Sequence, residues 1–152
     1  NPGVGGLMGH GHKHRSVNDP GYFGRLTVTH EVAAVTGACL AIEEATWRLL
    51  GGLDEKHLAV AYNDIDLCLQ ARQADLRVVF TPHARLIHHE SVSRGIDEDP
   101  DRNQRLGREV EVMRDRWGDL LSSDPAYSPN LSLDGGGFRL AETPRVKPRW
   151  RE

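Results

Sequence analysis

Hydrophobic residues along this chain gather in a few short stretches, which are separated by glycine-rich and charged segments. A continuous apolar run over Val32–Ile42 is rich in small and β-branched residues, and it predicts a buried strand. Helical spacing follows over Glu43–Leu50, and Gly51 and Gly52 then supply a left-handed helix stop. We therefore expect a strand, a short helix and a turn in this order.

Further along the chain, more segments have a clear period. Asn63–Ala74 has helical spacing, with Asn63 placed to cap the helix and two acids in its first turn. Arg77–Thr81 and Ala84–His89 read as two short strands. Apolar residues recur at helical spacing through Arg102–Leu121, which predicts an amphipathic helix that needs a partner surface.

Both ends of the chain lack such periodicity. Residues 1–24 are rich in glycine and histidine, and residues 122–152 are rich in proline and glycine. We expect an irregular N-terminal arm and an irregular C-terminal tail around an α/β domain over residues 25–121, built as a small mixed sheet with flanking helices. Because the chain starts with neither methionine nor a signal sequence, we expect it to begin partway through a longer protein.

Composition narrows the functional classes. A net charge of −3 offers no basic excess for nucleic acid, and no apolar run approaches the length of a membrane span. Cys39 and Cys68 lie in apolar stretches, which indicates reduced, buried thiols in a cytoplasmic protein. Arginines flank the apolar face of Arg102–Leu121, so peripheral contact with the inner face of a membrane stays open, although acidic residues on the helix favour packing on the domain.

A pair of carboxylates, Asp64 and Asp66, stands in the first turn of the predicted helix that Asn63 begins. Residues two apart on a helix are rotated by roughly 200°, so a regular first turn cannot aim both acids into one site. A positioned carboxylate can take the proton of a sugar hydroxyl, and Asp64 is our candidate general base. The alternative is that all three residues only cap the helix and complement its dipole.

A second polar cluster follows the predicted strand Ala84–His89. His88 or His89 suits a divalent ion such as Mn²⁺. Arg94 and the hydroxyls of Ser91 and Ser93 suit phosphate oxygens. Side chains alternate along a strand, so only one histidine can face a site. The alternative is a polar turn that binds nothing.

Four segments occur in a characteristic order: VTGACLAI, GGLDE, AYNDIDLCLQAR and RVVFTPHARLIHHESVSRG. Together they resemble the second half of glycosyltransferase family 2 enzymes of the GT-A fold, and most closely the bacterial enzymes that build surface polysaccharides. The resemblance spans Asp19–Leu133. It implies a partial GT-A, Rossmann-like fold: the acceptor-side, C-terminal half of an inverting enzyme, without the half that binds the nucleotide.

The same resemblance implies roles for particular residues. Asp64 takes the position of the general base in the family's acid pair, Asn63 replaces the usual Glu, and Asp66 follows as a second candidate acid. His88, with His89 as the alternative, matches a histidine that helps to bind the metal or the diphosphate. Trp47 is a candidate for lining the acceptor pocket, since aromatic faces stack on sugars, although core packing is the alternative.

The resemblance also implies what the intact protein needs. We expect a nucleotide-sugar donor, a saccharide or lipid-linked acceptor, and a Mg²⁺ or Mn²⁺ ion, with Arg94 and Ser93 near the donor diphosphate. The DID triplet at Asp64 and Asp66 spells D-x-D, but it lies where the family places its acid pair, so we do not interpret it as the metal motif. This chain by itself is expected to be inactive.

Two other functions remain open from the sequence. The chain can be a non-catalytic module that forms homo-oligomers through exposed strand edges. It can also be a metal-binding domain built on His10, His12 and His14, which are spaced by two residues in a glycine-rich loop.

Overall fold

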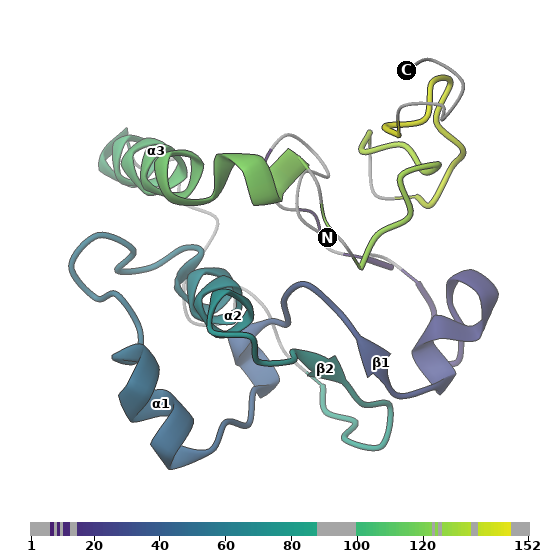
Figure 1. The fold of residues 1–152 in the computed structure, drawn as a ribbon, viewed down its shortest axis with the longest axis horizontal. Coiled ribbons are helices and arrows are strands. Elements are labelled where there is room, and N and C mark those ends of the chain that lie inside the picture. The colour runs from purple at the N-terminus through teal and green to yellow at the C-terminus, as the bar shows by residue number, and fades with distance from the viewer. Residues whose placement is uncertain are drawn as a thin grey trace.

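The computed structural model describes residues 7, 9, 11–12, 15–87, 100–122, 124, 126–134 and 137–146. Its main elements in chain order are η2 (Tyr22–Thr27), β1 (His30–Glu31), η3 (Gly37–Cys39), α1 (Glu44–Leu50), α2 (Asn63–Gln73), β2 (Val79–Phe80) and α3 (Pro100–Ser122). In Figure 1, α3 runs above α2. α1 lies below and to the left of α2, and the two strands lie to the right of α2. The expected mixed α/β class with a small sheet is confirmed.

The sheet differs from the prediction in position. β1 and β2 pair antiparallel with His30 opposite Phe80, and these two strands are the whole sheet in the described part of the chain. The strand predicted over Val32–Ile42 is wrong, because this run turns into η3. The hydroxyl of Thr36 accepts the N–H of Ala38, and such local side-chain bonds compete with a strand ladder.

The second strand predicted after Arg77–Thr81 is also wrong in its described part. Residues 84–87 are irregular, and Leu86 and Ile87 are 73% and 80% exposed, whereas β2 pairs instead with β1. His88 and His89 lie outside the described residues. The apolar residues of the segment Ala84–His89 were therefore not sufficient to predict a paired strand.

α1 forms where helical spacing predicted it and ends at the expected glycines. Gly51 takes a left-handed φ of 80°, and its N–H donates to the carbonyl of Arg48. The N–H of Gly52 donates to the carbonyl of Trp47. Two carbonyl groups at the helix end are thus satisfied by the backbone of the turn.

α2 has the predicted length, but its N-terminal cap differs. Tyr62 precedes the helix with a left-handed φ of 65°, and no side chain caps the helix there. The prediction that Asn63 is the cap is wrong: it is the first helical residue, and its Oδ1 accepts the N–H of Asp64. The predicted partner surface of α3 is found, since Leu69 of α2 packs with Met113 of α3.

The two cysteines have different environments. Cys68 is buried on α2, as predicted, and burial raises the pKa of its thiol. Cys39 is exposed, so the expectation that it is buried is wrong. It lies in η3 and not in the buried strand that was predicted for this run.

Part of the predicted irregular tail is ordered against the N-terminal arm. Leu131 pairs with Leu140 in an antiparallel bridge, and Tyr127 and Leu131 are buried together. The ring of Tyr22 stacks on Phe138 with 4.8 Å between centroids. Aromatic contacts therefore join the two ends of the chain. No helix in the described part of the chain is both long and apolar enough to cross a membrane.

Candidate functional site

Asp64 joins the start of α2 to the loop at η3. Its Oδ2 accepts the N–H of Gly37 at 2.6 Å, and its Oδ1 accepts the N–H of Ile65 at 2.8 Å. A Cβ on Gly37 would lie 3.2 Å from the Cβ of Asp64, so the approach favours glycine. Two motifs that lie 27 residues apart in sequence therefore meet at a half-buried carboxylate.

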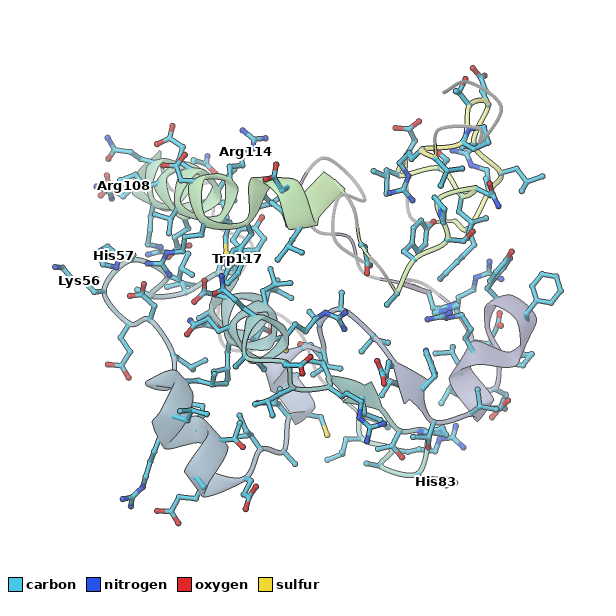
Figure 2. The ribbon with its side chains drawn as sticks, viewed as in Figure 1. Lys56, His57, His83, Arg108, Arg114 and Trp117 are labelled. Carbon is cyan, nitrogen blue, oxygen red and sulfur yellow. The ribbon has the colours of Figure 1, made fainter. Side chains whose placement is uncertain are left out.

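Asp66 points to the opposite region, between α2 and α3. It is 0% exposed and accepts hydrogen bonds from Trp117 Nε1 at 2.7 Å and from Gln70 Nε2 at 2.6 Å. Figure 2 shows Trp117 extending from α3 toward α2. The predicted rotation between Asp64 and Asp66 is thus seen in their different partners. A catalytic role for Asp66 stays a prediction.

Arg116 links two carboxylates of different segments. Its guanidinium is 2.5 Å from Asp54 and 3.2 Å from Asp66. The hydrogen bond with Asp54 raises the pKa of Arg116. Desolvation acts to raise the pKa of Asp54, but the bonds from the His57 N–H and from Arg116 outweigh it and hold this pKa well below its usual range. The turn after α1 is therefore tied to α3 by an ion pair.

Glu109 on α3 holds the segment that leads into α2. It is 2% exposed, and its two carboxylate oxygens accept the N–H groups of Val60 and Ala61 at 3.1 Å each. Neither Glu109 nor Arg116 was predicted from the sequence as part of a site. The position of Glu109 could have been predicted, because it precedes the core residue Met113 by four residues and so lies on the buried face of the helix.

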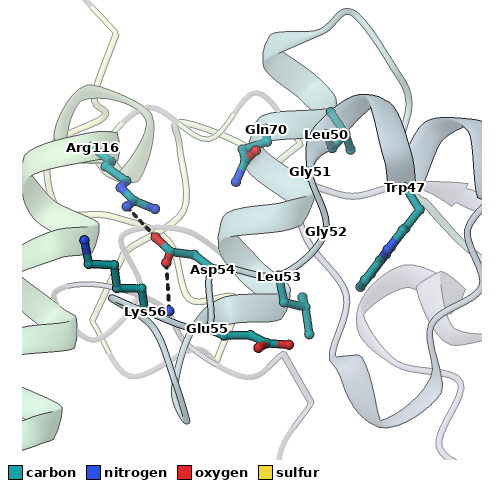
Figure 3. Close-up of a pocket in the computed structure, with 10 residues that line it drawn as sticks. All are labelled: Trp47, Leu50, Gly51, Gly52, Leu53, Asp54, Glu55, Lys56, Gln70 and Arg116. Carbon is teal, nitrogen blue, oxygen red and sulfur yellow. Dashed lines mark hydrogen bonds and ion pairs between the residues drawn. The ribbon is translucent and has the colours of Figure 1, made fainter.

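An open surface cavity of about 660 Å³ lies between the end of α1, the following turn, α2 and α3. Figure 3 shows its lining: Trp47, Leu50, Gly51, Gly52, Leu53, Asp54, Glu55, Lys56, Gln70 and Arg116. Trp47 lies across the Gly51–Gly52 turn from Arg116 and Lys56. Asp64 is not part of this lining. The structure thus gives Trp47 a place in a cavity wall, separate from the carboxylate predicted as the base.

The lining combines an aromatic side chain with balanced charges. Asp54 and Glu55 are opposed by Lys56 and Arg116, and the amide of Gln70 completes the polar side. Carboxylates accept hydrogen bonds, ammonium and guanidinium groups donate them, and an amide does both. Such a surface can bind a ligand that carries several hydroxyl groups.

The predicted contacts for the metal and the diphosphate fall on a segment that the structure does not describe. His88, His89, Ser93 and Arg94 lie outside the described residues. Within the residues that the structure does describe, no group of three metal-ligating side chains is found. Of the histidines in the N-terminal arm, His12 is described, and its ring stacks on Phe138. The described residues therefore do not fit a complete site for Mg²⁺ or Mn²⁺.

Comparison with known proteins gives two relatives. The chain is 45% identical over 148 residues to an uncharacterized protein, y4gI, of Sinorhizobium fredii (strain NBRC 101917 / NGR234), covering 97% of the chain and 16% of that protein. It is 37% identical over 122 residues to the O-antigen biosynthesis protein RfbC of Myxococcus xanthus, covering 80% of the chain and 9% of that protein. The chain thus spans only a small part of either relative. No family model and no solved structure matches it.

Proposed function

We propose that this chain is the acceptor-side part of an inverting glycosyltransferase in surface-polysaccharide synthesis, and that Asp64 is its general base. The similarity to a protein named for O-antigen biosynthesis is the observation that carries this proposal. The order of the four sequence segments supports the finer assignment to a sugar-transfer reaction.

The surroundings of Asp64 suit the work of a base. The N–H groups of Gly37 and Ile65 orient the carboxylate, and a carboxylate has about four acceptor positions in total. Asp64 is also half-buried, so a substrate hydroxyl can reach it. Asp66 differs in both respects, since it has no exposed surface and accepts three hydrogen bonds.

The reaction that follows is a single displacement. Asp64 takes the proton of the acceptor hydroxyl while the oxygen of that hydroxyl attacks the anomeric carbon of the donor sugar. The bond from that carbon to the nucleoside diphosphate breaks, and the diphosphate leaves with the electron pair. Attack from the side opposite the leaving group inverts the anomeric centre. The predicted diphosphate contacts His88, Arg94 and Ser93 lie outside the described residues.

The experiment is the Asp64→Asn substitution in the full-length natural protein, with sugar transfer as the readout. Asn keeps the size of the side chain and one acceptor oxygen but cannot take a proton, so transfer falls by at least about a hundredfold. Asp75→Asn is the matched control, because Asp75 is an exposed acid with a left-handed φ of 60°, which Asn tolerates well. Transfer by Asp64→Asn at the control's rate would overturn Asp64 as the base.

A further inference from the structure

Tyr62, the residue that precedes α2, has an unusual backbone conformation. Its φ of 65° and ψ of 0° lie in the left-handed region, which is disfavoured for a bulky side chain. Such residues persist only where their surroundings fix them, and they cluster at functional sites. Tyr62 stands two residues before Asp64, the proposed base. The contacts that fix Tyr62 therefore also fix the backbone that leads to the base.

Contacts on both sides of Tyr62 hold this conformation. On the preceding side, the buried carboxylate of Glu109 accepts the N–H groups of Val60 and Ala61 at 3.1 Å each. On the following side, the carbonyl of Tyr62 accepts the N–H of Asp66 at 2.8 Å. The ring of Tyr62 packs against the core cluster that contains residues of α2 and α3. The turn is thus held from α3 through Glu109 and from α2 through its first helical hydrogen bond.

The left-handed turn sets the direction in which α2 begins. The segment before Tyr62 is bonded to α3, whereas Asp64 after it is bonded to η3, where its Oδ2 accepts the N–H of Gly37 at 2.6 Å. A change of Tyr62 to the ordinary helical conformation would rotate its φ by roughly 130°. Such a rotation would redirect the first turn of α2 and separate the carboxylate of Asp64 from Gly37.

We propose that Tyr62 and Glu109 are positioning residues for Asp64: the left-handed turn at Tyr62 aims the carboxylate, and Glu109 holds the turn. This inference rests on the proposed function, in which Asp64 is the base. Glu109 is 2% exposed, so it does not itself meet a substrate. It acts on the reaction through the backbone of Val60 and Ala61, and through Asp64.

The first measurement compares sugar transfer by two variants of the full-length natural protein, Tyr62→Asn and Tyr62→Ala. Both variants remove the ring and its packing against the core, but asparagine tolerates a left-handed φ better than alanine does. We expect kcat of Tyr62→Asn to be at least about fivefold higher than that of Tyr62→Ala, with similar KM values. Equal kcat values of the two variants would overturn the role of the turn.

The second measurement tests whether Glu109 acts through Asp64. Glu109→Gln keeps the size of the side chain but replaces one acceptor oxygen by a donor, so one of the two backbone bonds is lost. We expect kcat to fall about tenfold, because a misplaced base reacts slowly. Glu111→Gln, at an exposed residue of α3, is the matched control and should leave kcat unchanged.

A double-mutant cycle separates positioning from a general structural effect. In the Asp64→Asn background, Glu109→Gln should lower the residual transfer less than about twofold, because the group that Glu109 positions is already lost. The same factor in both backgrounds would show that Glu109 has only a structural role, and would overturn the proposal.

A third measurement follows the position of Asp64 without the reaction. In the 152-residue chain, the amide proton of Gly37 donates a short bond to the Asp64 carboxylate, so its NMR resonance reports whether Asp64 is in place. We expect Glu109→Gln to move this resonance upfield, and Glu111→Gln to leave it unchanged. An unmoved Gly37 resonance in Glu109→Gln would overturn the positioning role.

Failure of the positioning role is distinguishable from failure of the proposed function. Undiminished transfer in Asp64→Asn overturns the base, and a Gly37 resonance that still depends on Glu109 would then report a structural coupling alone. Lost transfer in Asp64→Asn, with kcat unchanged in Glu109→Gln, overturns the positioning role and leaves the base.

Discussion

The first turn of α2 carries two carboxylates that lie in different regions of the molecule and differ in burial and in hydrogen-bond partners. Toward α3, Asp66 is fully buried and accepts hydrogen bonds from three side chains. Toward the loop at η3, Asp64 is half-buried and accepts two backbone N–H groups. Both residues are aspartates on the same helix. The carboxylate of Asp66 is occupied by hydrogen bonds from neighbouring side chains, whereas the carboxylate of Asp64 keeps acceptor positions for a substrate.

This difference shows how burial separates structural from chemical roles. An ionised group without contact with water is costly unless it is fully paired, and a fully paired group has no free position for a substrate. A carboxylate oriented by backbone N–H groups at a surface is held in place and remains accessible. The region toward α3 is thus expected to respond to mutation in stability, and the region toward η3 in activity.

The largest expected effect is on the α3 side. Asp66→Ala removes the buried acceptor of the Trp117 indole N–H and one of the two carboxylates that contact Arg116, which keeps Asp54, so we expect a loss of about 3 kcal/mol in the free energy of unfolding. Urea titration followed by tryptophan fluorescence measures it. Asp115→Ala, at an exposed acid on α3, is the control and should change little. A loss below about 1 kcal/mol would mean that this contact does not hold α2 to α3.

A smaller effect is expected at Glu109. Glu109→Ala removes the acceptor of the N–H groups of Val60 and Ala61 but leaves both near solvent, since these two residues are not fully buried. We expect a loss of about 1–3 kcal/mol, together with faster amide hydrogen exchange at the two N–H groups. Glu111→Ala on the exposed face of α3 should leave both quantities unchanged. Unaltered exchange in Glu109→Ala would contradict the role of this carboxylate.

The smallest of these effects depends on pH and concerns Asp54. Because folding lowers the pKa of Asp54, its contribution is present above the unfolded value of 3.8 and is lost as the pH falls below it. At neutral pH we expect Asp54→Asn to be less stable than the natural chain by about 1 kcal/mol. This difference should shrink below about pH 4. A difference that is constant with pH would rule out the ion pair with Arg116 as its source.

The sequence predicted the features that depend on local pattern. α1, α2 and α3 formed where helical spacing indicated, and α1 ended at Gly51, because a helix and its stop are encoded by neighbouring residues. The apolar run Val32–Ile42 was misjudged, since its burial comes from packing on α2 rather than from pairing with another strand. Apolar character predicted that the segment packs, but not the conformation in which it does so.

The site was predictable only in part. The resemblance indicated Asp64 and Trp47, but no local pattern indicated that Arg116 reaches Asp54 and Asp66, which lie 62 and 50 residues away in sequence. Contacts of this kind are fixed by the tertiary packing of α3. Gly52 was visible in the sequence as a helix stop, and its contact with Trp47 appeared only in three dimensions.

The most direct test of the account measures sugar transfer and thermal unfolding on the same preparation of full-length Asp64→Asn protein. Transfer is expected to fall at least about a hundredfold while the protein stays folded, with a melting temperature lowered only by the loss of one of the two bonds from the N–H groups of Gly37 and Ile65, because Asn has a single acceptor oxygen. Asp64 then acts in the chemistry and Asp66 in the scaffold. Undiminished transfer by a folded Asp64→Asn protein would contradict the central claim.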